Sequence, residues 1–414
     1  MQKEENMRAY ERLINYTKYP TVSDVKSFTR PSTPTQLEFG KVLVQEMLEL
    51  GIKDAFMDEC GCVYGTIPAT KDDPKGPVIG FLAHLDVASD APCFPVKTSI
   101  VSNYDGGDIT LSEGIVMKSS DYEVLMDCVG HDLLVTDGTT LLGCDDKAGI
   151  AEILTMAEYF LNNPDIPHGT IRIGFIPDEE IGRGADLFDV EKFGADFAYT
   201  VDGGAFGLVE YETFSAYSAD ITVNGVSIHP GVAKNKMVNA SLVAMEFNSM
   251  LPSVERPEHT EHREGFYHLT EMTGVVEKAT LSYLLRDHED DLLDKRAETV
   301  NNIAKYLNEK YGEGTVTVEI KEWYRNMRNV IKENWHLMEQ AYKAVEKVGG
   351  VPRSNPVRGG TDGSQLSFMG LPCPNLGTGC YNAHSRFEFA SIQSMDKVVE
   401  SLIEIAKAYT DYEV

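Results

Sequence analysis

The chain has 414 residues, 42% of them hydrophobic, and a formal charge of −28 at pH 7 from 65 acidic and 37 basic residues. This length predicts two or three domains with enough apolar residues for sizeable cores. The negative charge disfavours nucleic acid and anionic membranes as partners and favours a cationic ligand, such as the ammonium group of a peptide.

Membrane and disulfide classes are also disfavoured. No apolar run reaches the length of about 18 residues that a transmembrane helix needs, and the polar N-terminus lacks the apolar core of a signal peptide. We therefore expect a cytoplasmic protein. The seven cysteines are scattered and form no CxxC motif, which argues against a disulfide framework or a cysteine-rich zinc module.

Short apolar runs alternate with helical patterns in the first half, which is typical of an α/β fold. A helix is predicted over 33–50, and Gly51 is placed to end it. The run 76–84 is fully apolar, as in the central strand of a mixed or parallel sheet. Further predicted elements are a helix over 145–162 and strands over 170–177 and 197–202.

The pattern changes near residue 211, where apolar and polar residues alternate as in a half-exposed strand. Two strand–helix–strand-like units fit a small α+β domain inserted at 211–326. The flanking residues 1–210 and 327–414 then form one discontinuous domain that ends in a helix over 391–409. In the inserted domain, the helices are expected to align Val238, Leu242 and Met245 in the first, and Leu293, Val300, Ile303 and Leu307 in the second.

Histidine and acidic residues follow the predicted strands. They are His84, Asp145, Glu179, Glu180 and Asp202, with His384 in a later Gly-rich loop. Ligands of open α/β sheets bind beyond the carboxyl ends of the strands, and two histidines with several carboxylates suit zinc, manganese or cobalt. Each motif alone is commonly a helix cap or a solvated loop. The residues by themselves therefore leave a metal site and a purely structural role equally open.

Longer motifs carry a resemblance. AHLDV, TDGTTLLGCDDKAGIAEI, PDEEIGRGA, YTVDGG, HPGVAKNKMVNA, RGGTDGSQLSFMGLPCPNLGTG and YNAHSRFEF resemble the peptidase T family of zinc aminotripeptidases, over essentially the whole chain. The wider group of dipeptidases and amino-acid deacylases shares only the metal motifs. The resemblance implies a zinc-exopeptidase-like mixed sheet with helices on both faces and an inserted lid domain. Lid domains of the wider group often mediate dimers, so the resemblance allows a homodimer.

The resemblance also implies a metal centre of two Zn²⁺ ions per subunit, for which Co²⁺ or Mn²⁺ could substitute. The implied ligands are His84 and Asp202 for the first ion, Glu180 and His384 for the second, and Asp145 as the bridge.

Asp86 and Glu179 match the two catalytic positions of the family. Asp86 can accept the second ring N–H of His84 and so fix its tautomer. Glu179 is expected to act as general base on a zinc-bound water, whose pKa zinc lowers to about 7, and to return the proton to the leaving amine. His229 is expected to reach from the lid and hold the oxyanion, with a local turn role as the alternative.

Three further residues are candidate binders of the peptide termini: Arg286, Arg358 and Asn382. Arginine forms bidentate pairs with carboxylates, but a structural ion pair or loop hydrogen bond is equally open for each. The chain departs from the family pattern at Cys144, where a small residue such as alanine is expected, and at Ser385, where glycine is expected. Neither departure removes a ligand.

The expected function is therefore metal-dependent release of the N-terminal residue from small peptides, specifically tripeptides. One alternative is a dipeptidase or N-acyl amino acid hydrolase on the same two-zinc site. A more remote alternative is a non-catalytic peptide-binding protein, whose signature would be a missing base or ligand.

Overall fold

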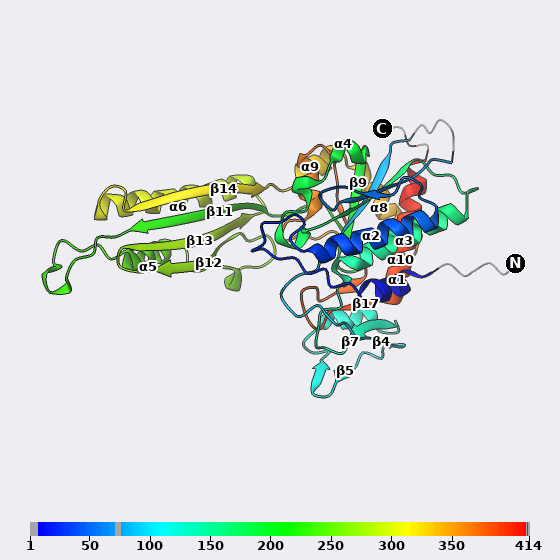
Figure 1. Cartoon of the computed structure of the whole chain (residues 1–414), viewed down its shortest axis with the longest axis horizontal. Helices are drawn as coiled ribbons and strands as arrows, with labels where there is room; N and C mark the ends of the chain where they lie inside the picture. The colour runs from blue at the N-terminus through cyan, green and yellow to red at the C-terminus, as the bar shows by residue number, and fades with distance from the viewer. Residues whose placement is uncertain (1–6, 71–75, 411, 413–414) are drawn as a thin grey trace. The chain divides into compact units, whose positions relative to one another are not determined.

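The computed structural model describes residues 7–70, 76–410 and 412, so the first six residues of the polar N-terminus lie outside the described part. The chain forms two compact units (Figure 1). The first extends to Tyr211 and also contains Asn329–Asn355 and the chain from Thr361 onward. The second consists of Glu212–Arg328 and Pro356–Gly360.

A seven-stranded mixed sheet forms the centre of the first unit. Its order is β1 (Phe56–Met57), β2 (Val63–Ile67), β8 (Ile171–Ile176), β3 (Ile79–His84), β9 (Phe197–Gly203), β15 (Asn375–Gly377) and β10 (Val209–Glu210). The four central strands β8, β3, β9 and β15 run parallel, and the outer strands are antiparallel to their neighbours. All six residues of β3 are buried, as expected for a strand covered on both faces.

Helices cover both faces of this sheet (Figure 1). Those of the first unit are α1 (Ala9–Tyr16), α2 (Pro34–Leu50), α3 (Cys144–Asn162), α4 (Val190–Phe193), α8 (His336–Lys347), α9 (Asp362–Phe368) and α10 (Ile392–Ala408). Helix α3 packs along β3 and β9. On the sheet face opposite α3, Leu82 of β3 packs in a cluster with Phe193 of α4 and Leu366 of α9. The two faces differ because successive side chains of a strand point to opposite sides of the sheet. Gly51 ends α2 at a φ of 106°, as predicted.

Smaller sheets complete the first unit. One has the order β16 (Cys380–Tyr381), β17 (Phe389–Ser391), β7 (Leu133–Thr136) and β4 (Thr98–Val101), and the other pairs β5 (Ile109–Ser112) with β6 (Ile115–Met117). A further short helix, α7 (Arg328–Glu333), begins at Arg328 in the second unit. Its remaining residues belong to the first unit.

The second unit is an antiparallel sheet with two helices. The strand order is β12 (Phe266–Gly274), β13 (Lys278–Asp287), β11 (Ser215–Asn224) and β14 (Val316–Tyr324), and the helices are α5 (Ala240–Met250) and α6 (Asp290–Tyr311). Alternate residues of β13 are buried, and they share a core with Phe247 of α5 and Val300 of α6. The predicted α/β fold with an inserted α+β part is therefore confirmed. Among the described residues, no helix is both long and apolar enough to cross a membrane.

The second unit differs from the sequence-based predictions in two details. The sequence predicted no strand at β12, which lies at an edge of the sheet. Leu242 and Met245 of α5 are 62% and 58% exposed, so they are not on its core face. Val243, Ala244 and Phe247 are buried instead, because the face of α5 that packs on the sheet carries these three residues. The four apolar residues expected on α6 are all buried.

Residues 356–360 also group with the second unit, whereas the expected domain bounds put them in the first. The reason is backbone pairing: Phe214 donates to the carbonyl oxygens of Val357 and Gly359, and Val357 donates to that of Glu212.

Candidate metal centre

The local fold brings the candidate ligands to one edge of the large sheet. His84 is the last residue of β3, and Glu180 lies in the turn Glu179–Ile181 that follows β8. Asp202 is the second-last residue of β9, which is the other neighbour of β3. Because β8, β3 and β9 are parallel, their carboxyl ends meet at the same edge.

Two groups of ligand atoms form at this edge, each with its atoms within 4.8 Å of one another. In the first, Nε2 of His84 lies 3.0 Å from Oδ1 of Asp145 and 3.4 Å from Oδ1 of Asp202. In the second, Nε2 of His384 lies 2.9 Å from Oε2 of Glu180 and 3.7 Å from Oδ2 of Asp145. The two groups therefore share Asp145, which offers a different oxygen to each.

The donor set fits divalent cations. Two imidazoles and three carboxylates suit zinc, cobalt or manganese. The Oε1 atom of Glu180 is buried and has no hydrogen-bond partner in the part of the chain that the structure describes. A buried carboxylate oxygen without a partner is costly, and a cation at this position would satisfy it.

Burial and the close approach of charged groups shift the pKa values of the acids and histidines in this centre. Burial raises the pKa of Asp202 to about 7, although His84 opposes the shift. Burial by itself would lower the pKa of His84, but Asp202 and Asp145 outweigh it and raise that pKa. The hydrogen bond with Glu180 raises the pKa of His384 to about 9. Without a cation, the centre therefore retains protons that bound divalent ions would displace.

Asp86 contacts the end of β3 and the turn that follows β8. Ring atom Nδ1 of His84 lies 3.1 Å from the backbone oxygen of Asp86 and 3.4 Å from its Oδ1. The carboxylate also accepts the backbone N–H groups of Glu179 at 3.0 Å and Glu180 at 3.1 Å. Asp86 thus has a wider structural role than the orientation of His84 that the sequence predicted.

Glu179 is a partly buried acid that adjoins the candidate ligands. Burial raises the pKa of its carboxyl well above the usual range, and the charge of Asp202 adds to this effect. The structure records no hydrogen bond to this carboxylate from any described residue. Since Glu180 belongs to the second ligand group, the adjacent Glu179 is left outside both groups.

Other buried side chains hold the ligand backbones, and the sequence analysis did not identify them. Asp146 accepts the N–H of His84 at 3.1 Å, and Asn375 accepts that of Asp202 at 3.2 Å through Oδ1. Glu388 accepts that of Asp145 at 3.0 Å. In the sequence, each of these three residues is only a polar residue within a motif or next to an apolar run. That pattern is too common to identify them as residues that position the candidate ligands.

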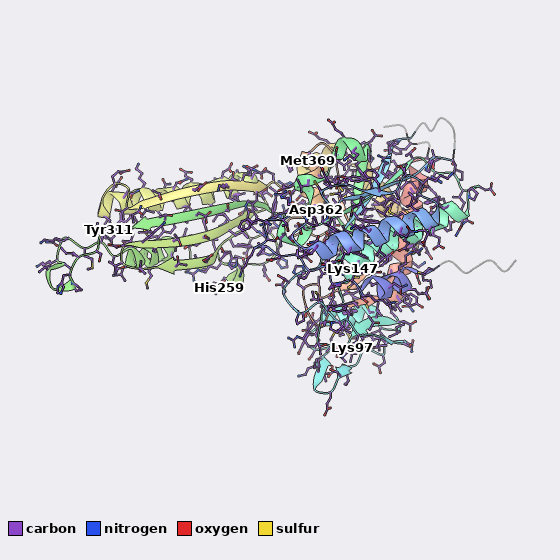
Figure 2. All side chains as sticks on the ribbon, in the orientation of Figure 1. Lys97, Lys147, His259, Tyr311, Asp362 and Met369 are labelled. Atoms are coloured by element: carbon purple, nitrogen blue, oxygen red, sulfur yellow. The ribbon has the colours of Figure 1, made fainter. Side chains whose placement is uncertain are left out.

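Two further buried ionisable residues, Lys147 and Asp362, lie in the same unit and are labelled in Figure 2. Burial lowers the pKa of Lys147 to about 8. It raises the pKa of Asp362 to about 8, with Asp202 and Asp86 adding to the shift and His84 opposing it. The protein therefore surrounds the centre with groups whose charged forms are disfavoured by burial.

The remaining predicted site residues are engaged elsewhere. His229 belongs to the second unit, where its Nδ1 accepts the N–H of Gly231 at 3.1 Å. Asn382 is in the first unit and donates to the carbonyl of Phe387 at 3.1 Å. Neither makes a recorded contact with either ligand group.

The two arginines belong to the second unit. Arg286 donates to the backbone oxygen of Arg358 at 3.2 Å, and its buried Nε has no partner among the described residues. Arg358 donates to the carbonyls of His262 and Glu264, both at 2.9 Å, and its guanidinium lies 5.1 Å from the ring centroid of Phe214. These contacts favour the structural alternative for Arg358.

Known proteins resemble the chain along nearly its whole length. A family model described as a peptidase dimerisation domain matches residues 211–315. Peptidase T of Halothermothrix orenii is 50% identical over 404 residues, which cover 97% of this chain and 99% of the relative. Peptidase T of Clostridium perfringens is 51% identical over 406 residues, which cover 98% and 99%. The crystal structure of a tripeptidase from Staphylococcus aureus has the same fold, with a TM-score of 0.77, 21% identity and 99% coverage of both chains.

A mixed α/β sheet with two histidine–carboxylate groups at one edge defines a metallohydrolase-type protein. At the identity and coverage of these relatives, the chain belongs to the peptidase T family. The relatives confirm the family predicted from the sequence, and with it the prediction of a metal-dependent peptidase.

Proposed function

We propose that the chain is a two-metal aminopeptidase that releases the N-terminal residue from tripeptides, with zinc as the metal. The observation that carries this proposal is the position of Asp145. Its Oδ1 faces His84 at 3.0 Å, and its Oδ2 faces His384 at 3.7 Å. A carboxylate that offers one oxygen to each of two histidine groups suits a bridge between two cations.

In this proposal, each ion has one histidine and one further carboxylate. The first would be held by His84 and Asp202, the second by Glu180 and His384, and both by Asp145. When bound, the ions would polarise the scissile carbonyl and lower the pKa of the attacking water.

Glu179 is the proposed general base. Its raised pKa suits a group that accepts a proton and then returns it. Glu179 would take the proton from the attacking water and deliver it to the amine nitrogen as the C–N bond breaks. Asp86 would keep Glu179 in place through the backbone hydrogen bond of 3.0 Å, while it also orients His84.

Substrate recognition involves the remaining candidates. Arg286 is the favoured partner of the peptide carboxylate, because its buried Nε has no partner among the described residues. His229 is proposed to hold the oxyanion, and Arg358 and Asn382 stay weaker candidates since their donors are already used within the chain. The match to a peptidase dimerisation domain supports a homodimer. A cytoplasmic location stays a prediction.

The first test is a matched series of a dipeptide, a tripeptide, a tetrapeptide and an N-acetylated tripeptide. Each would be incubated with the full chain, with and without a chelator, and then with zinc added back. We expect cleavage of the free tripeptide alone, lost on chelation and restored by zinc. Preference for the dipeptide or the acetylated peptide would overturn the substrate assignment and favour a dipeptidase or an acyl amino acid hydrolase. Tripeptide cleavage that survives complete metal removal would overturn the metal mechanism.

A further inference from the structure

Glu388 is a buried carboxylate next to the second ligand group. It lies between His384 and strand β17, with 2% of its surface exposed. Its Oε2 accepts the backbone N–H groups of Leu142 at 2.8 Å and Gly143 at 2.7 Å. Its Oε1 accepts the N–H of Asp145 at 3.0 Å. One side chain therefore binds three amides of the turn that carries the shared ligand.

These three amides need an acceptor from outside the turn. They precede or begin α3, where backbone N–H groups have no partner within the helix. Gly143, the residue before the helix, has a φ of 73° and no side chain to cap it. A carboxylate is well suited to the position because the N-terminal end of a helix carries partial positive charge and charge-assisted hydrogen bonds are strong.

The backbone of Glu388 belongs to the loop that carries His384. The backbone N–H of Glu388 donates to the carbonyl of Ser385 at 3.0 Å, which closes a turn directly after His384. The side chain of Asn382 donates to the carbonyl of Phe387 at 3.1 Å and closes the loop from the other side. Asp145 and Glu388 are 243 residues apart in the sequence. Glu388 thus connects the two segments that hold the shared ligand and the second histidine.

We propose that Glu388 is a positioning residue that sets the distance between Asp145 and His384 and thereby the affinity of the centre for its metal ions. This inference rests on the proposed assignment of Asp145 and His384 as ligands. Among the residues of the two ligand groups, the Glu388 carboxylate has a recorded contact only with the backbone N–H of Asp145. Its effect on metal affinity would therefore be transmitted through the backbone.

The variant Glu388→Gln tests this most sharply because it keeps the size of the side chain. Its amide oxygen can still accept the N–H groups of Leu142 and Gly143. Its NH₂ group would then face the N–H of Asp145, and two donors repel each other. We expect zinc affinity to fall by about 10–100-fold, the range found when residues that orient metal ligands are replaced. The measurement is a competition titration of metal-free full-length protein with a chromophoric zinc chelator.

A matched control is Glu152→Gln in α3. Glu152 is also fully buried, and neither of its oxygens has a hydrogen-bond partner among the described residues. We expect this variant to bind zinc as the wild type does. An equal loss of affinity in both variants would show a general effect of neutralising buried acids and would overturn the positioning role.

A second variant, Asn382→Gly, keeps the test decisive if Glu388→Gln does not fold. Asn382 has a φ of 56°, which glycine adopts without strain, so the variant removes the hydrogen bond to Phe387 and the weak contact with the sulfur of Met117 at 4.0 Å. We expect the second zinc ion, which His384 would hold, to bind more weakly, and the affinity for the first ion to be unchanged. Wild-type affinity for both ions in the two loop variants would overturn the inference. Wild-type affinity in Asp145→Asn would instead overturn the proposed ligand assignment itself.

Discussion

The two histidines of the centre are built into the protein in different ways. His84 ends a central strand, its side chain is 1% exposed, and its backbone N–H is held by Asp146. His384 lies in a loop at a φ of 63°, and its side chain is 46% exposed. Strands position side chains more rigidly than loops do. In the proposed two-metal centre, the first ion should therefore be bound more tightly than the second.

The largest effect is expected at the residue that both groups share. Replacing Asp145 by Asn removes a carboxylate from each group at once. Because changes in residues that only orient ligands already cost about 10–100-fold in affinity, we expect a loss of more than about 100-fold for both ions, with activity lost in parallel. Metal analysis of the dialysed protein checks this. Retention of two ions would remove the basis for treating the groups as one centre.

The next largest effect separates catalysis from metal binding. Replacing Glu179 by Gln should lower kcat by about 10²–10⁴-fold, the usual contribution of a general base. Metal content should stay unchanged since Glu179 lies outside both ligand groups. Steady-state kinetics on a tripeptide, with metal analysis of the same sample, measure both quantities. Normal turnover in this variant would contradict the assigned base.

Stability should distinguish the two histidines directly. Replacing the buried His84 by Ala leaves the carboxylates of Asp145 and Asp202 without their nearest cationic partner, whereas His384→Ala leaves a group that solvent can reach. We expect His84→Ala to cost about 1–3 kcal/mol more in the free energy of unfolding of the metal-free protein. Urea unfolding of both variants provides the comparison. Equal costs would mean that the difference in exposure has no energetic consequence.

The smallest effect concerns the outer partner of the exposed histidine. Oδ2 of Asp90 lies 3.3 Å from Nδ1 of His384, and the Asp90 side chain is 60% exposed. Exposed ion pairs contribute little, so Asp90→Asn should weaken the second ion by less than the roughly tenfold minimum typical of buried partners. Asp86→Asn, at the buried partner of His84, should weaken the first ion more. The two variants can be compared in the same chelator competition.

The sequence alone determined which histidine and acidic residues are candidate ligands and that they share one edge of the sheet. His84, Glu180 and Asp202 each follow an apolar strand, and parallel strands put their ends on the same side of a sheet. It also determined the ends of regular elements, such as Gly51 after α2, since a local conformation with positive φ favours glycine. These features depend on residues close together in the chain, where spacing and conformation are directly related.

Only the tertiary structure decided which atoms of the candidate ligands face one another and which other residues hold them in place. His384 meets Glu180 and Asp145, and Glu388 meets the turn before α3 across 243 residues. It also decided that Val243, rather than Leu242, lies in the core under α5. Such choices depend on which surfaces pack together, because a buried acid or an apolar side chain is selected by its partners in space. The spacing of residues along the chain carries no information about those partners.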